Sequence, residues 1–263
     1  MAEIKQFSQF RPDGMRFNKV PMTIQVGVCG SGSIVLVSDT KVRNSERVLS
    51  NKPLVQSVAH QQKVVFGSRY NVAVAMAGEG AIGTDPAKEL ADHLSGLDLL
   101  PEDYIGPVVV EWGNAYAGKH LSRMSFNPEL PLFSLLVVTP DAEGCRLCKL
   151  FVGRDVADVP SSRYLVNGHD NSPAIFWLEW MRADDPAIGL EPATGIAITT
   201  VLTAGELNPY GIGGIEVHQF SGGLWKHWTL AECDNAIAQH KALTTKLKAA
   251  VASLGPPVPP PQP

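Results

Sequence analysis

Residues 22–41 read MTIQVGVCGSGSIVLVSDTK, and this stretch decides how the rest of the chain is interpreted. Two short apolar runs flank a glycine-containing turn at 30–32. Such a pattern predicts two strands joined by a tight turn. Thr23 opens the first strand and Asp39 follows the second, so antiparallel pairing would bring these two residues together.

A threonine at the start of a chain carries a nucleophilic hydroxyl and a free α-amine that can accept the hydroxyl proton. Thr23 would become such a residue if the chain were cut before it. Asp39 and Lys63 lie downstream, where such a site would need an acid and a base. Taken singly, threonine is a common strand former, aspartate a common turn residue and lysine a common surface residue. Their joint order between apolar runs indicates a catalytic site.

The overall composition places the chain among globular proteins. Its 263 residues are 44% hydrophobic and 18% charged, with a formal charge of −4. This suits one large domain with a proper core. The chain has no basic stripe that would favour nucleic acid and no apolar run of about 18 residues that could span a membrane. The first 21 residues lack the apolar core of a secretory signal, so we expect a cytoplasmic protein.

The four cysteines do not indicate a disulfide framework in a chain of this length. Cys145 and Cys148 form a Cys-x-x-Cys pattern, but no second cysteine or histidine pair lies at zinc-binding spacing. Both fall in an apolar run, where we interpret them as strand residues. We therefore predict no metal site and no organic cofactor.

The hydrophobic pattern predicts secondary structure in blocks rather than in alternation. Further strands are expected at 63–66, 71–77, 132–139, 145–152, 164–166 and 214–220, and helices from 84 and over about 102–121, 173–183, 192–206 and 229–253. Two antiparallel sheets packed face to face, with helix pairs outside, satisfy this order. Residues 41–61 are expected to form a polar connection.

The chain divides into three parts by composition. We predict a leader or propeptide at 1–22, a single domain at 23–253 that ends in a helix, and a proline-rich tail at 254–263. The tail is typical of a disordered polyproline segment.

The chain resembles the proteasome β-type family of N-terminal-nucleophile (Ntn) hydrolases over about residues 22–220. In that family a mature N-terminal threonine is followed by an apolar strand, a glycine turn and a second strand ending in Ala/Ser-Asp-x-Arg. The equivalents here are Thr23, the turn at 30–32 and Ser38-Asp39-Thr40-Lys41. Bacterial members look most similar, namely HslV and the proteasome homologues called Anbu and the betaproteobacterial homologue. The resemblance implies an α+β fold, a four-layer αββα sandwich.

The same resemblance implies four catalytic residues. Thr23 Oγ would attack a peptide carbonyl, with its α-amine as general base. Lys63 would stand beside the hydroxyl, and Asp39 would hold Lys63 protonated and oriented. The amide of Gly78 would stabilise the oxyanion. Lys52 is an alternative to Lys63, but it precedes a proline in an unpatterned stretch.

Other motifs of the family are matched less well. Val42 and Met76 would line the first specificity pocket, favouring an apolar residue before the cut. Gly168-His169-Asp170 stands where the family has Gly-Ser-Gly, although His169 or Asp170 could substitute for the serine. Asn208-Pro209-Tyr210-Gly211 lacks the acid and the hydroxyl of the family's Asp-x-x-Ser-Gly. These departures threaten activity more than fold.

These implications predict a threonine-type endopeptidase subunit that hydrolyses peptide bonds inside a homo-oligomeric stack of rings. Its substrates would be peptides or unfolded proteins, and an ATP-dependent unfoldase is a partner that the resemblance allows. Either Thr23 removes its own leader, although Met22 stands where self-cleaving relatives usually have glycine, or translation starts at Met22 and methionine removal exposes Thr23. Two alternatives stay open: a catalytically silent ring or scaffold subunit that keeps its leader, and a hydrolase of small-molecule amides.

Overall fold

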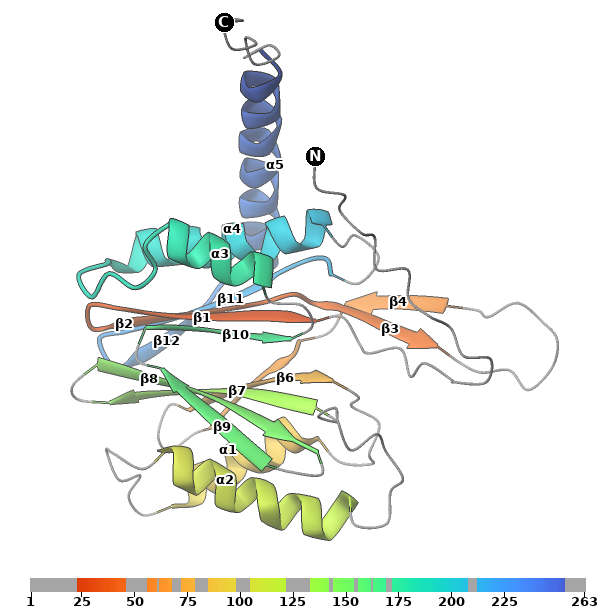
Figure 1. Ribbon diagram of the computed structural model, residues 1–263, viewed down its shortest axis with the longest axis vertical. Helices are drawn as coiled ribbons and strands as arrows, with labels where there is room; N and C mark the ends of the chain where they lie inside the picture. The colour runs from red at the N-terminus through yellow and green to blue at the C-terminus, as the bar shows by residue number, and fades with distance from the viewer. Residues whose placement is uncertain are drawn as a thin grey trace, which may run out of the picture.

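A computed structural model of the chain shows two sheets stacked between layers of helices (Figure 1). The residues that it describes are 23–45, 56–60, 62–67, 72–78, 85–97, 105–121, 133–141, 144–153, 156–161, 163–168, 172–207 and 212–253.

The first sheet, as far as the chain is described, has the strand order β10-β1-β2-β11-β12, with antiparallel neighbours throughout. Its strands are β1 (Ile24–Gly30), β2 (Ser33–Ser38), β10 (Tyr164–Gly168), β11 (Glu216–Ser221) and β12 (Leu224–His227). The turn between β1 and β2 contains Gly32 with φ +62°, a conformation that glycine adopts without strain. The first hairpin therefore forms where the sequence predicts it.

The second sheet has the order β5-β6-β7-β8-β9 within the described ranges, and it is also antiparallel. Its strands are β5 (Val64–Phe66), β6 (Ala73–Gly78), β7 (Phe133–Asp141), β8 (Gly144–Val152) and β9 (Val156–Ser161). Among the described strands β5 and β9 are its edges, so β5 has one ladder partner, β6, within the described part of the chain.

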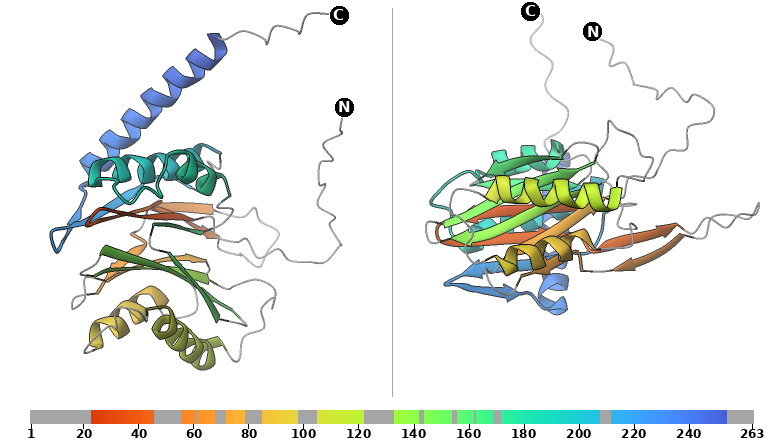
Figure 2. Two further views of the ribbon diagram at one scale, coloured as in Figure 1. Left: turned by 60° about the vertical axis from the view of Figure 1, so that its left-hand side comes forward. Right: turned by 90° about the horizontal axis from the view of Figure 1, so that it is seen from below.

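Helices cover the outer faces of both sheets (Figures 1 and 2). The second sheet is covered by α1 (Pro86–Gly96), α2 (Ile105–Tyr116) and a π-helical turn (Ala117–Leu121), and the first sheet by α3 (Ser172–Trp180) and α4 (Leu190–Leu207). The last helix, α5 (Leu230–Ser253), starts beside α4 and extends away from the body. None of the described helices combines the length and the apolar character that a membrane crossing requires.

Among the described residues, side-chain alternation along the strands builds three apolar clusters. In β2, Val35 and Val37 pack toward α3 and α4, whereas Leu36 packs against the second sheet. There it joins Leu136 and Leu147, and all three leucines are fully buried. Both faces of β1 and β2 are buried, one under the helices and one against the second sheet. Their sequences are therefore largely hydrophobic rather than alternating.

The fold class predicted from the sequence is confirmed, since two antiparallel sheets lie face to face between helices. The polar connection expected at 41–61 is wrong, because β3 (Lys41–Ser45) pairs with β4 (Gln56–His60) in a separate two-stranded sheet. β9 and β12 were also not expected. The apolar residues of β9 are interrupted by Asp158 and followed by Pro160, and β12 has only four residues. The predicted leader and tail lie outside the described residues.

Two cysteines test the expectation from composition. Cys148 is a buried free thiol within β8, as expected of a strand residue, and burial raises its pKa to about 12. Cys29, in β1, is disulfide-bonded, which the cysteine count did not predict.

Candidate active site

The hairpin of β1 and β2 brings Thr23 and Asp39 to the same end of the first sheet. In its register, Gln25 pairs with Ser38. Just beyond this pair, the Asp39 N–H donates to the Ile24 carbonyl at 3.0 Å, and the Ile24 N–H donates to Asp39 Oδ1 at 3.0 Å. These bonds hold the Asp39 carboxylate beside the main chain that follows Thr23. The antiparallel pairing expected of the two strands produces this proximity.

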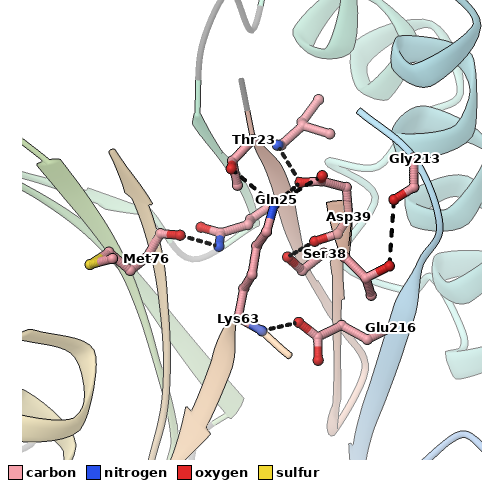
Figure 3. Close-up of polar contacts among 10 residues, drawn as sticks. Thr23, Gln25, Ser38, Asp39, Lys63, Met76, Gly213 and Glu216 are labelled. Atoms are coloured by element: carbon pink, nitrogen blue, oxygen red, sulfur yellow. Dashed lines mark hydrogen bonds and ion pairs between the residues drawn. The ribbon is translucent and has the colours of Figure 1, made fainter. Parts of the chain in front are cut away.

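Lys63 reaches this pair from the second sheet, where it directly precedes β5 (Figure 3). Its Nζ lies 3.0 Å from Thr23 Oγ1, 3.0 Å from Asp39 Oδ1 and 2.9 Å from Asp39 Oδ2. The Lys63 side chain is 10% exposed and that of Asp39 is fully buried. Three of the predicted site residues therefore meet between the two sheets, while their catalytic roles stay predictions.

Burial governs the protonation of this ion pair. It lowers the pKa of Lys63 below the ordinary value of 10.5, while the charge and hydrogen bonds of Asp39 act in the opposite direction. Burial likewise raises the pKa of Asp39, opposed chiefly by the charge of Lys63. A lysine whose pKa is lowered more readily becomes a neutral amine, which can accept a proton. The arrangement can thus supply either a cation beside the Thr23 hydroxyl or a proton acceptor for it.

Replacing Asp39 with asparagine is expected to lower the pKa of Lys63 further. The carboxylate charge is the largest influence that raises this pKa, and an amide carries no such charge. Acetylation of the Lys63 amine by acetic anhydride, followed by mass spectrometry across pH, should show its midpoint moving to lower pH. Asp92→Asn, which changes an exposed pair with Lys88, is the matched control and should leave the Lys63 midpoint in place. A Lys63 midpoint that stays or rises in Asp39→Asn would contradict the proposed pairing.

A buried polar network links the two sheets next to the site. Gln25 is fully buried; its Nε2 donates to the Met76 carbonyl at 2.8 Å, and its Oε1 accepts from Asn167 Nδ2 at 2.7 Å. Ser134 Oγ in turn donates to Asn167 Oδ1 at 2.5 Å. Such buried groups are stable only when they are hydrogen-bonded. They fix β1 and β10 relative to β6 and β7, and the sequence analysis did not single out Gln25 or Asn167.

Gly168 lies against the main chain of Thr23. It pairs with Ile24 across β10 and β1, and its φ is +124°. A Cβ at this position would lie 1.8 Å from the Thr23 carbonyl oxygen. Only glycine fits there, since the backbone conformation and the available space both exclude a side chain. The glycine that opens the predicted Gly168-His169-Asp170 motif is therefore required by the position of Thr23.

The structure describes the main chain of Gly78, Met76 and Val42, but the side chain of Met76 alone. Gly78 ends β6 with φ +131°, two residues beyond the Met76 carbonyl that Gln25 binds. The Met76 side chain is half-buried and packs against the apolar cluster under α1 and α2. The main chain of Val42 pairs with Ala59 in the β3–β4 hairpin, and its side chain is outside what the structure describes. The roles given to Gly78, Val42 and Met76 stay predictions.

Several residues of the sequence analysis lie outside the described residues altogether. They are Lys52, His169, Asp170, Asn208 and Gly211. Among the described residues, no group of three or more histidine, cysteine, aspartate or glutamate side chains could hold a metal ion.

Comparison with known proteins relates this fold to the proteasome-like arrangement. No family model matches the sequence, and no curated protein matches it. Among solved structures, the chain is similar to Anbu (ancestral beta-subunit) from Yersinia bercovieri, with a TM-score of 0.65 and 14% sequence identity. The similarity covers 91% of this chain and 100% of that chain. The chain therefore has a proteasome-like Ntn-type fold.

Proposed function

We propose that this protein is a proteasome-like threonine peptidase subunit in which Thr23, exposed as the first residue of the mature chain, attacks peptide bonds. The observation that carries the proposal is the position of Lys63 Nζ, 3.0 Å from Thr23 Oγ1 and within 3.0 Å of both Asp39 carboxylate oxygens. A lysine amine in contact with both a hydroxyl and a buried carboxylate supplies the components of an activated nucleophile.

The proposed reaction begins with proton transfer from the Thr23 hydroxyl to a base. After removal of residues 1–22, that base is the freed α-amine of Thr23, acting directly or through water, with Lys63 stabilising the oxygen as it gains negative charge. The oxygen forms a bond to the peptide carbonyl carbon, and the carbon–nitrogen bond then breaks. The departing amine takes the proton, which leaves an acyl ester on Thr23. Water adds to this ester, and its hydrolysis releases the acid product and restores the hydroxyl.

The carbonyl oxygen gains negative charge during this reaction and needs a hydrogen-bond donor. We assign that role to the N–H of Gly78. An oxyanion donor contributes about 2.7–4 kcal/mol in comparable sites. Gly78 ends β6, whose Met76 carbonyl is bound by the Gln25 side chain from β1. This contact supports the assignment because it ties the end of β6 to the strand that begins after Thr23.

We further propose that the subunit assembles with itself into stacked rings and cleaves peptides or unfolded proteins within them in the cytoplasm. The support is the similarity in fold to a protein described as an ancestral beta-subunit. An ATP-dependent unfoldase is a candidate partner of such an assembly. Val42 and Met76 are the proposed lining of its first specificity pocket.

A catalytically silent ring or scaffold subunit is the second candidate function. The observation that favours it is Met22 directly before Thr23, where self-cleaving members of the resembled family usually have glycine. A subunit that keeps its leader has an amide rather than an amine at Thr23, and it therefore lacks the proposed base. The two candidates differ in the covalent state of one nitrogen atom.

Covalent labelling tests the proposed function. A peptidyl vinyl sulfone with an apolar residue before its reactive group should add its mass to the wild-type chain at Thr23 and should not label Thr23→Ala. Thr245→Ala removes an exposed threonine hydroxyl from α5 and is the matched control, which should be labelled like the wild type. Labelling that survives Thr23→Ala would overturn the assignment of the nucleophile.

A further inference from the structure

The segment that carries Lys63 is weakly fixed by its own sheet. β5 has three residues and lies at an edge, with β6 as its one ladder partner in the described part of the chain. The Lys63 carbonyl accepts from the Met76 N–H at 3.4 Å, a long hydrogen bond. Because Lys63 must reach Thr23 and Asp39 on the opposite sheet, something else has to hold its main chain.

The hairpin of β11 and β12 contacts both ends of this segment. At the start, the Lys63 N–H donates to Glu216 Oε1 at 2.7 Å (Figure 3). At the end, the Phe66 ring packs edge-on against His218, Trp225 and His227, with ring centroids 5.0, 5.2 and 4.6 Å away. Residues 63–66 therefore rest on the first sheet as well as on the second.

The orientation of the Glu216 carboxylate is itself fixed. Glu216 pairs with Ser38 across β11 and β2, which places it beside the residue preceding Asp39. Its Oε2 lies 3.3 Å from His218 Nε2, and His218 Nδ1 lies 2.8 Å from His227 Nδ1. Only one of the two Nδ1 atoms can carry the shared proton. When His227 Nδ1 carries the proton, it donates a hydrogen bond to His218 Nδ1. His218 then donates from Nε2 to Glu216 Oε2, so the hydrogen bonds form a continuous series from His227 to Glu216.

Glu216 and His218 are buried, so their hydrogen bonds matter for stability. Glu216 is 7% exposed and His218 is 4% exposed, so an unpartnered carboxylate oxygen here would be costly. The Glu216 charge also raises the pKa of Lys63, in the same direction as Asp39. Glu216 therefore acts on Lys63 through its main chain and through its charge.

We propose that Glu216 is a positioning residue for Lys63: its carboxylate, oriented by His218 and His227, holds the Lys63 main chain so that Nζ reaches Thr23 and Asp39. The effect of Glu216 on catalysis rests on the proposed function. Asp39 then fixes the far end of the lysine side chain, while Glu216 fixes the near end.

The test compares Glu216→Gln and Glu216→Ala with the wild type in the full chain. Labelling by the peptidyl vinyl sulfone gives a maximal rate and a half-saturating concentration, and acetic anhydride gives the acetylation midpoint of Lys63. Glu111→Gln, an exposed change on α2, is the matched control. Glutamine keeps an oxygen that can accept from the Lys63 N–H, whereas alanine keeps none. Glutamine also preserves the shape of the side chain, should the alanine variant fail to fold.

We expect Glu216→Ala to lower the maximal labelling rate by up to about 100-fold, as a displacement of about 1 Å can do. Glu216→Gln should lose less, and the half-saturating concentration should stay unchanged in both variants. The Lys63 midpoint should move to lower pH in both, because the negative charge is lost. Glu111→Gln should behave like the wild type. A midpoint and a maximal rate that match the control in the glutamine variant would overturn the proposal, as would an equal loss in both variants without any change in midpoint.

Failure of the proposed function would be recognised separately. If the wild-type chain is never labelled at Thr23, the peptidase assignment fails, and the Lys63 midpoint alone decides the role of Glu216. A midpoint that moves further from the wild-type value in Glu216→Ala than in Glu216→Gln then supports the positioning role, because only alanine lacks the acceptor oxygen. Equal midpoints in the two variants overturn it.

Discussion

Lys63→Met is expected to slow hydrolysis of a peptide amide by about 10²–10³-fold, the range lost when one group that stabilises developing negative charge is removed. It is also expected to reduce the free energy of unfolding by about 3–5 kcal/mol, because the fully buried Asp39 carboxylate would lose its cation. Peptide-amide turnover and urea unfolding measure the two effects. Methionine fills a volume similar to the lysine stem, so lost packing contributes little to either.

A second substitution separates catalysis from stability in this prediction. Asp39→Asn combined with Lys63→Met removes the uncompensated charge and should restore most of the unfolding free energy, yet it should leave turnover as low as in Lys63→Met. Recovery of turnover in the double variant would show that Lys63 matters only for folding. A single Lys63→Met variant with wild-type turnover would exclude Lys63 from the chemistry.

Gly168→Ala is expected to have the second largest effect. Its left-handed φ of +124° is strained for alanine, and the added Cβ would lie 1.8 Å from the Thr23 carbonyl oxygen. Backbone strain and overpacking each cost about 1–3 kcal/mol, so a loss of about 3 kcal/mol or more in unfolding free energy is expected. β10 must also move away from Thr23, which should reduce turnover.

Gly32→Ala provides the matched control for this glycine. Gly32 has φ +62°, but no atom lies within 4 Å of an added Cβ. The Gly32→Ala variant should therefore lose about 1–2 kcal/mol of unfolding free energy, from backbone strain alone, and its turnover should stay unchanged. Equal losses of stability in the two variants, with turnover unchanged, would contradict the close approach of Gly168 to Thr23.

The sequence pattern was sufficient for the parts of the site that depend on local structure. Two apolar runs around a glycine turn place Thr23 and Asp39 together, since antiparallel register follows from a tight turn. The resemblance to a known family pointed to Lys63 rather than Lys52, and Lys63 is the lysine found beside both residues.

The contacts between the sheets could not be read from the sequence. Glu216, Gln25 and Asn167 are buried polar residues in strands of the first sheet, and each binds a residue of the opposite layer that is distant along the chain. The available signal is a charged or amide residue inside an apolar strand run, as in Ile215-Glu216-Val217. That signal marks a buried polar group, but it does not identify the partner, because the partner depends on how the sheets stack. The hairpin at β3 and β4 was missed for the related reason that its strands are polar.

The start of the mature chain tests the central claim most directly. Intact-mass measurement of the protein purified from its native cells, combined with turnover of a peptide amide, should show that the active species begins at Thr23. The Thr23→Ala chain should be inactive, whatever its first residue. A protein that hydrolyses peptide amides while every molecule still carries residue 22 would contradict the account, because Thr23 would then have no free amine.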